Sequence, residues 1–240
     1  MLEYTELKRN RRTLLAFTGL TFKEFKALLP PFVEAYRRMY EGEQTVTGHK
    51  RQRLAGGGRR STLQTFEQKQ LFILVYLKTY PLQVVMGELF GVSQSSANHW
   101  IHRLLPALRD ALTQLGVMPQ RDADQFARSE RKKKESSEYI IDGTERRRQR
   151  PQNPEKQALH YSGKKKIHAD KNVVIVNSQS KRVGYLSPTY AGKTHDKKVV
   201  DQEHIVYPRT TILYQDTGFQ GYAPKVADCR QPKKSRAAKS

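Results

Sequence analysis

Two aspartates follow short apolar runs, at positions where a β-strand would end. Asp142 comes after residues 139–141, and Asp216 comes after residues 212–215. Carboxylate oxygens are the ligands that hard cations such as Mg²⁺ prefer, and waters and substrate phosphates complete the coordination. Two such ions can bind the attacking and leaving oxygens of a phosphodiester. The pair therefore predicts a site for a divalent metal, Mg²⁺ or Mn²⁺, that acts on a phosphodiester.

The surroundings of the two aspartates favour a ligand that carries phosphate. Gly143 follows the first aspartate and Gly218 lies two residues beyond the second, which would leave room for a ligand to approach the backbone. Basic residues between the aspartates would draw a phosphate backbone to the metal. Those that we expect to contact DNA are Arg146, Arg147, Lys164, Lys165 and Lys166. The simpler alternative is two aspartates that cap turns or pair with nearby arginines.

The composition of the chain points to a nucleic acid partner. Its 240 residues include 44 Lys and Arg against 23 Asp and Glu, a formal net charge of +21. A surface of this charge accumulates on polyanions, with a ribosome-like RNA binder as the alternative. One cysteine, Cys229, excludes an internal disulfide and a cysteine-based zinc site, which fits a reducing cytosol. The longest apolar run, residues 71–77, is too short to span a bilayer. We therefore expect a cytoplasmic protein without a membrane partner.

The elements that would position these residues fall into two parts. From residue 138 onward, short β-branched or aromatic runs predict strands at 139–141, 173–176, 183–186 and 212–214, with a helix over 195–203. Residues 20–40 and 61–115 have helical spacing instead, with a helix that begins near Thr65. The Pro30-Pro31 pair predicts two helices rather than one in the first of these stretches.

Charged and glycine-rich segments suggest where these parts join. Residues 48–60 combine glycines with arginines, as a flexible basic linker does. Residues 119–137 are polar and crowded with charge, which predicts a second linker. The expected organisation is a helical DNA-binding domain over 1–118, a charged linker over 119–137 and an α/β domain over 138–240.

Residues 83–104 have the pattern of a helix-turn-helix. Gly87 is small where two helices would approach closely, Gly91 would end the first helix, and Ser93 can cap the second. The second helix of such a motif lies in the major groove, where Asn or Gln can pair with adenine and Arg with guanine. The side chains that would point inward are Ala97, Trp100, Ile101 and Leu104, and those on the DNA face are Gln94, Ser95, Asn98, His99 and Arg103. An ordinary helical hairpin with a hydrated polar face is the alternative.

A series of spaced motifs runs through the second half of the chain. The motifs are Asp142-Gly143-Thr144-Glu145, Arg150-Pro151, Lys156-Gln157, Tyr161-Ser162-Gly163-Lys164-Lys165-Lys166-Ile167-His168, Lys171-Asn172, His195-Asp196-Lys197-Lys198 and Asp216-Thr217-Gly218-Phe219-Gln220-Gly221-Tyr222. This series resembles the catalytic domain of bacterial insertion-sequence transposases of the DDE superfamily, in members that carry an N-terminal helix-turn-helix.

The resemblance implies an α+β chain, with an all-α helix-turn-helix domain followed by an RNase H-like α/β domain. It implies that Asp142 and Asp216 are the first and second metal-binding acids, and that Mg²⁺ activates water and then a DNA 3′-hydroxyl. The implied partners are transposon terminal inverted repeats and target DNA, while self-association into a homo-oligomer stays open. His195 and Asp196 belong to a recurrent motif of the family but are not assigned as metal ligands. Glu145 would point to the opposite face of its strand from Asp142, so it is not assigned either.

The resemblance ends near residues 231–234, where family members continue into a helix that supplies a third acid. No glutamate follows Asp216 here. We therefore expect an incomplete RNase H-like domain, explained by a degenerate element, by a first reading frame joined to a second through frameshifting, or by an interrupted gene. The expected function is a transposase that is truncated or frame-split and inactive alone. The alternative is a non-catalytic DNA-binding regulator that inhibits transposition.

Overall fold

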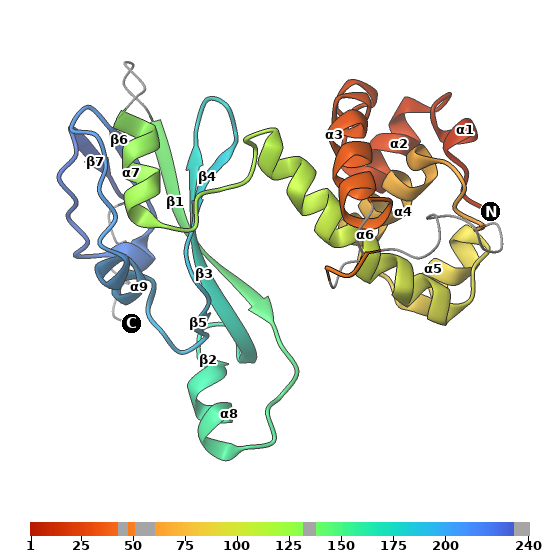
Figure 1. Cartoon of the computed structure of the whole chain (residues 1–240). Helices are drawn as coiled ribbons and strands as arrows, with labels where there is room; N and C mark the ends of the chain where they lie inside the picture. Colours follow the sequence, from red (N-terminus) through yellow and green to blue (C-terminus); the bar gives the residue numbers. More distant parts are fainter. Residues whose placement is uncertain (43–47, 51–60, 132–137, 233–240) are drawn as a thin grey trace. The chain divides into compact units, whose positions relative to one another are not determined.

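The computed structural model describes residues 1–42, 48–50, 61–131 and 138–232 (Figure 1). The chain divides into two compact units, Met1–Val117 and Met118–Ser240. Our expectations for the basic segment at 51–60, for residues 132–137 and for residues 233–240 lie outside the described residues. Within the described ranges, no helix combines the length and the apolar character that crossing a membrane requires.

The first unit is helical, and its core surrounds one central helix. Its elements are α1 (Tyr4–Leu7), α2 (Arg11–Thr18), α3 (Phe22–Tyr40), α4 (Phe66–Thr79), α5 (Gln83–Phe90) and α6 (Gln94–Gln114). Residues 69–75 of α4 are all buried, so this helix packs against neighbours on every side. Thr65 caps α4 by accepting a hydrogen bond from the backbone N–H of Gln68, which confirms the predicted start of the helix.

Helix α3 corrects the prediction of two helices, because it continues through Pro30 and Pro31. The prolines lack the N–H groups that would bond to the carbonyls of Lys26 and Ala27. Both of those residues and Pro30 are exposed, so water can satisfy the two carbonyls. Burial of the opposite side then holds the helix together, through Phe25, Leu28, Phe32, Ala35 and Tyr36.

The second unit is built on a mixed β-sheet. Its strands are β1 (Glu138–Arg147), β2 (Tyr161–Ser162), β3 (Ile167–Asn177), β4 (Val183–Leu186), β5 (Tyr190–Ala191), β6 (Ile212–Gln215) and β7 (Asp228–Arg230). Its helices are α7 (Ala123–Arg131), α8 (Pro154–His160), α9 (Asp196–Glu203) and the 3₁₀-helix η1 (Thr217–Phe219). The four predicted strands and the predicted helix are confirmed, whereas the short strands β2, β5 and β7 and the helices α7 and α8 were not predicted.

The sheet order places β1 at the centre. Strand β3 pairs with β1 antiparallel and carries β2, β4 and β5, all antiparallel, while β6 pairs with β1 and β7 pairs with β6, both parallel. Together with the N-terminal helices, this mixed sheet confirms the expected α+β class and is consistent with an RNase H-like domain.

Helix α7 corrects the prediction of a charged linker over 119–137. Its Phe126 is fully buried, and the ring contacts Tyr139, Tyr185 and Tyr207. The preceding Gln120 exchanges backbone hydrogen bonds with Gly184 and Leu186 around β4. The described part of this segment, residues 119–131, therefore belongs to the second unit despite its charge, because Phe126 anchors α7 in the core.

The two faces of the sheet differ in burial. Val199 and Val200 of α9 share a buried cluster with Phe126, Tyr139 and Ile141. On the opposite face of β1, Ile140 is 41% exposed and Asp142 is exposed. Because side chains alternate along a strand, one face builds the core and the other presents Asp142 to solvent.

Candidate active site and DNA-binding face

The structure brings the two predicted acids together at one end of the sheet. Strands β1 and β6 are parallel neighbours, and Ile141 is in register with Gln215. The next residue in each case is an acid, Asp142 within β1 and Asp216 directly after β6, so the two lie beside one another. Both line a pocket of about 560 Å³, together with Ile140, Ile141, Tyr214, Gln215, Arg230, Gln231 and Pro232.

Asp216 is held in place by backbone and side-chain hydrogen bonds. Its Oδ1 accepts from the backbone N–H of Gly218, 2.9 Å away, as the N-cap of η1. Its backbone carbonyl accepts from Gln231 Nε2 at 2.6 Å. The strand end is therefore fixed on both sides of the carboxylate.

Arg230 adds a positive charge to the pocket wall that the sequence motifs did not single out. Its Nη1 donates to the Tyr214 hydroxyl at 2.8 Å, and its Nε donates to Asp228 Oδ2 at 2.7 Å. The guanidinium also lies over the Tyr214 ring, 5.3 Å from its centroid. An arginine held in this way presents a fixed cation beside the two acids.

The donor set at this pocket fits a hard divalent cation. Mg²⁺ is commonly held by one or two carboxylates and keeps waters and substrate phosphates as its other ligands. Asp142 is solvent-exposed, and Asp216 has one oxygen engaged by an N–H group. Within the described ranges, no group of three or more His, Cys, Asp or Glu side chains could hold a metal without such outside ligands.

The expectation that Gly143 and Gly218 leave room for a ligand is wrong. A Cβ atom at Gly143 would lie 2.5 Å from Asp196 Oδ1, and one at Gly218 would lie 2.8 Å from Asp196 Oδ2. The room that we expected for a ligand is therefore filled by the Asp196 side chain. The cause is tertiary, since Val199 and Val200 bury α9 on the sheet and bring its first turn over both strand ends.

Asp196 belongs to a buried ionic cluster on the side of β1 opposite Asp142. The Lys171 ammonium lies 2.9 Å from Asp196 Oδ1 and 3.3 Å from Glu145 Oε1, and it donates to the Thr194 carbonyl at 2.8 Å. The side chains of Lys171, Glu145 and Asp196 are only 7%, 6% and 15% exposed. Glu145 and Lys171 are cross-strand partners, so Glu145 does point away from the pocket, as expected.

The pKa of Glu145 reflects this cluster. Burial raises the pKa of the carboxyl, but a hydrogen bond with Ser162 and the positive charge of Lys171 outweigh burial and bring it below its ordinary value. Glu145 is therefore ionised at neutral pH, and the cluster contains two carboxylates around one ammonium.

Helices α5 and α6 have the geometry predicted for residues 83–104. Gly91 has φ +64°, and the Ser93 hydroxyl accepts from the backbone N–H of Ser96. A Cβ at Gly87 would lie 2.5 Å from the Val92 carbonyl oxygen, which confirms the close approach. Of the side chains predicted to point inward, Ala97, Ile101 and Leu104 are buried, and Trp100 is half-buried against the core.

Four of the five side chains predicted for the DNA face of α6 are exposed. They are Gln94, Ser95, Asn98 and His99. Asn98 Oδ1 accepts from Gln83 Nε2 of α5 at 2.9 Å, so a residue of the first helix orients this amide.

The fifth side chain predicted for the DNA face, Arg103, differs from the prediction because it is only partly exposed. Its Nε donates to the Tyr36 hydroxyl at 2.9 Å, and its guanidinium lies 4.4 Å from the Tyr40 ring centroid. Arg103 therefore packs against Tyr36 and Tyr40 of α3 and stabilises the helical core, and it does not lie on the exposed face with the other four side chains.

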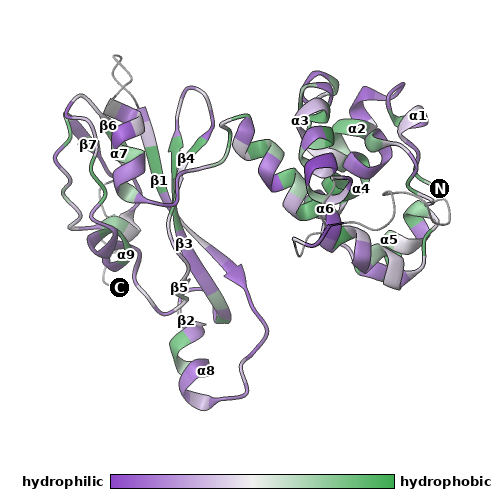
Figure 2. Cartoon of the chain, in the orientation of Figure 1, coloured by the Kyte–Doolittle hydropathy of each residue, from purple (hydrophilic) through white to green (hydrophobic). Residues whose placement is uncertain are grey.

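The basic residues predicted to contact DNA are exposed around the far ends of β1 and β3. They are Arg146, Arg147, Lys164, Lys165 and Lys166. Arg146 Nη2 donates to Asn172 Oδ1 at 2.8 Å, which tethers its side chain to β3. The hydrophilic colouring of this end of β3 is visible in Figure 2. We refer to these ends of β1 and β3, with β2 and α8, as the basic arm.

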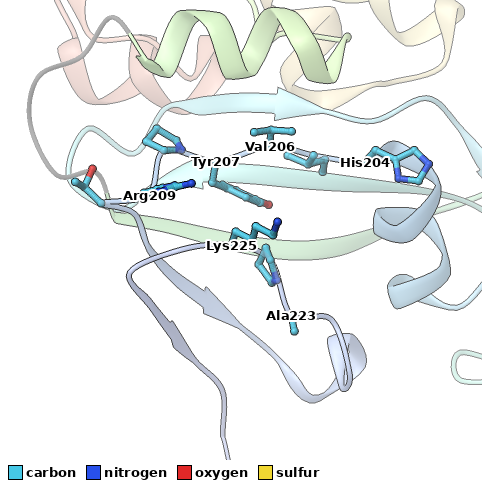
Figure 3. Close-up of a pocket in the computed structure, with 10 residues that line it drawn as sticks. His204, Val206, Tyr207, Arg209, Ala223 and Lys225 are labelled. Carbon is cyan, nitrogen blue, oxygen red and sulfur yellow. The ribbon is translucent and has the colours of Figure 1, made fainter.

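A larger pocket lies elsewhere in the second unit. It measures about 840 Å³ and is lined by residues 204–210 and 223–225, which precede β6 and β7 (Figure 3). Arg209 and Lys225 lie beside the buried Tyr207 in this pocket (Figure 3). Neither predicted acid lines it, so the candidate active site is the smaller pocket at the other end of β6.

Comparisons with known families agree with this division. Residues 61–114 match the family described as the helix-turn-helix of DDE superfamily endonuclease, and residues 141–238 match the family described as DDE superfamily endonuclease. The first match covers α4, α5 and α6, and the second begins one residue before Asp142. No curated protein and no solved structure matches the chain.

Proposed function

Because the chain belongs to the DDE superfamily of transposases, with a helix-turn-helix region followed by an endonuclease domain, we propose that it binds transposon ends and acts on their phosphodiester bonds at Asp142 and Asp216. The observation that carries this proposal is that Asp142 on β1 and Asp216 directly after the parallel neighbour β6 line one pocket of about 560 Å³.

DNA recognition is assigned to the exposed face of α6. The second helix of a helix-turn-helix enters the major groove with its N-terminal residues on base edges. Gln94, Ser95 and Asn98 lie in the first turns of α6 and are exposed. Their amides and hydroxyl are the groups that read bases, with Asn or Gln on adenine as a preferred pairing. The terminal inverted repeats of the transposon are the proposed site.

Chemistry is assigned to the residues of the smaller pocket. Asp142 and Asp216 would hold Mg²⁺ or Mn²⁺, and a bound divalent ion supplies Lewis-acid activation of water and of a DNA 3′-hydroxyl. Gly218 and Gln231 keep Asp216 in place through their hydrogen bonds. Arg230 places a positive charge beside the acids, where it attracts the scissile phosphate. The lysines and arginines of the basic arm bind flanking phosphates of end or target DNA.

Two carboxylates define metal geometry only loosely. We therefore expect weak nicking and little or no strand transfer from the 240-residue chain alone. This expectation keeps a second function open, that of a regulator that occupies transposon ends without catalysis. The helix-turn-helix supports that function by itself, since its exposed face involves no residue of the pocket.

The test compares wild type with Asp142→Asn on a DNA duplex selected by the chain from a random pool. Asp142 is exposed, so the variant should fold and bind DNA as wild type does. We expect Mn²⁺-dependent nicking near the selected site by wild type and none by the variant. Equal nicking by both proteins would refute the assignment of Asp142. Binding without nicking by wild type would favour the regulator.

A further inference from the structure

We infer that Asp196 is a positioning residue of the metal site, an inference that rests on the proposed function. The carboxylate of Asp196, which is paired with Lys171, fixes the position of the backbone that carries Asp142 and Asp216. Asp196 does not line the pocket, so it acts through the two strand ends and not as a ligand.

Contact with the backbone beside each acid is the first support. Asp196 Oδ1 occupies the position next to Gly143, the residue that follows Asp142. Asp196 Oδ2 occupies the position next to Gly218, whose N–H donates to Asp216 Oδ1. One carboxylate therefore lies against the backbone beside both acids, next to the residue whose N–H group orients Asp216.

The fit between α9 and the segment after Asp216 is the second support. A Cβ at Gly221, which has φ +84°, would lie 3.2 Å from Lys197 Cε. The first turn of α9 thus packs against η1 and against the residues that follow it. The Asp196 carboxylate already fills the space beside Gly143 and beside Gly218. A longer side chain at position 196 would therefore have to displace the end of one strand.

The ionic cluster explains why an acid is needed at this position. Lys171 forms an ion pair with Asp196 Oδ1 at 2.9 Å, and its ammonium also donates to the Thr194 carbonyl and pairs with Glu145. An amide would keep the shape of Asp196 but lose the ion pair that holds its rotamer. Residues that orient the ligands of a metal typically change metal affinity by about 10-fold to 100-fold when they are mutated.

The experiment is a titration of the full chain with Mn²⁺, in which electron paramagnetic resonance measures the free ion. We expect Asp196→Asn to raise the dissociation constant of the pocket by about 10-fold or more. The matched control is Asp201→Asn, the same change on the same helix at an exposed salt bridge with Lys197, and its affinity should equal that of wild type. Asp142→Asn should abolish binding at the pocket.

These variants separate the inference from the function on which it rests. If Asp142→Asn binds Mn²⁺ as wild type does, the metal site and the proposed function both fail. If Asp142→Asn loses binding while Asp196→Asn binds as wild type does, only the positioning role fails. A contribution to stability alone would lower the unfolding midpoint of Asp196→Asn and leave its Mn²⁺ affinity unchanged.

If Asp196→Asn does not fold, a second variant tests whether Asp196 positions the metal site. Gly143→Ala keeps every charge but places a Cβ 2.5 Å from Asp196 Oδ1, so the carboxylate must move. We expect weaker Mn²⁺ binding by this variant. Gly163→Ala is its control, because nothing lies within 4 Å of the added atom. Equal affinity of the two alanine variants would overturn the inference.

Discussion

Replacing Lys171 by methionine would remove the cation that lies between two buried carboxylates. Glu145 and Asp196 would both lose an ion pair, and the Thr194 carbonyl would lose its donor. Breaking a buried ion pair by removing one partner typically costs about 3–5 kcal/mol, because the remaining charge stays buried without compensation. We expect a loss of this size for the second unit near pH 7, which corresponds to a fall of roughly 2 M in the urea midpoint.

The pH dependence of this loss follows from Glu145. The folded pKa of Glu145 lies below its ordinary value, so its contribution to stability is present above the unfolded pKa and is lost as the pH falls through the folded one. Lys171→Met removes the part of this contribution that comes from Lys171 and keeps the part that comes from Ser162. The difference in stability between variant and wild type should therefore be full above the ordinary glutamate pKa of 4.5, and it should shrink as the pH falls below that value.

Urea unfolding followed by circular dichroism reports both units, and the fluorescence of Trp100 reports the helical unit alone, so a transition that only circular dichroism detects belongs to the second unit. Trp100 is the only tryptophan of the sequence and packs in the helical unit, so its transition should not change. Lys198→Met is the matched control, since Lys198 is exposed on α9. A loss below about 1 kcal/mol, the range of exposed ion pairs, or a loss that does not diminish at acidic pH, would refute the argument.

Two further predictions concern the helix-turn-helix. Gly87→Ala should cost the helical unit about 1–2 kcal/mol, because a Cβ 2.5 Å from the Val92 carbonyl overpacks the turn while alanine recovers some helix propensity. Unfolding followed by Trp100 fluorescence measures this cost, and an unchanged midpoint would contradict the close approach. Asn98→Ala should weaken binding to the selected duplex by about 1–3 kcal/mol without changing the dependence on salt. Fluorescence anisotropy measures both, and an equal loss on a scrambled duplex would show that Asn98 binds the backbone and not a base.

Features fixed by nearby residues were predictable from the sequence. Thr65 and Ser93 cap helices through groups three residues away, and Gly91 ends a helix at its own position. The two acids were predictable because each directly follows an apolar run that forms a strand. Their adjacency depended on the parallel pairing of β1 with β6, which the fold supplies.

Features decided by distant contacts were not predictable. The helix through Pro30 and Pro31 depends on burial of its other face, and α7 is anchored by the burial of Phe126 against distant aromatic residues. The sequence around Gly143 and Gly218 predicted room for a ligand, because no neighbouring residue indicates that Asp196 fills the space beside both glycines. Arg103 looked exposed for the same reason, because its partner Tyr36 lies 67 residues earlier in the chain.

The basic arm has a consequence for the length of DNA that the second unit can contact. Arg146 lies four residues beyond Asp142 on the same strand, so its side chain shares the face of Asp142, at a distance of about 14 Å for the usual rise of an extended chain. Successive phosphates on one strand of B-DNA are spaced by about 3.4 Å along the axis, nearly the rise of one strand residue. A duplex aligned with β1 would therefore meet Arg146 about four base pairs from the phosphate bound at the acids, so a substrate must extend about that far to contact the arm.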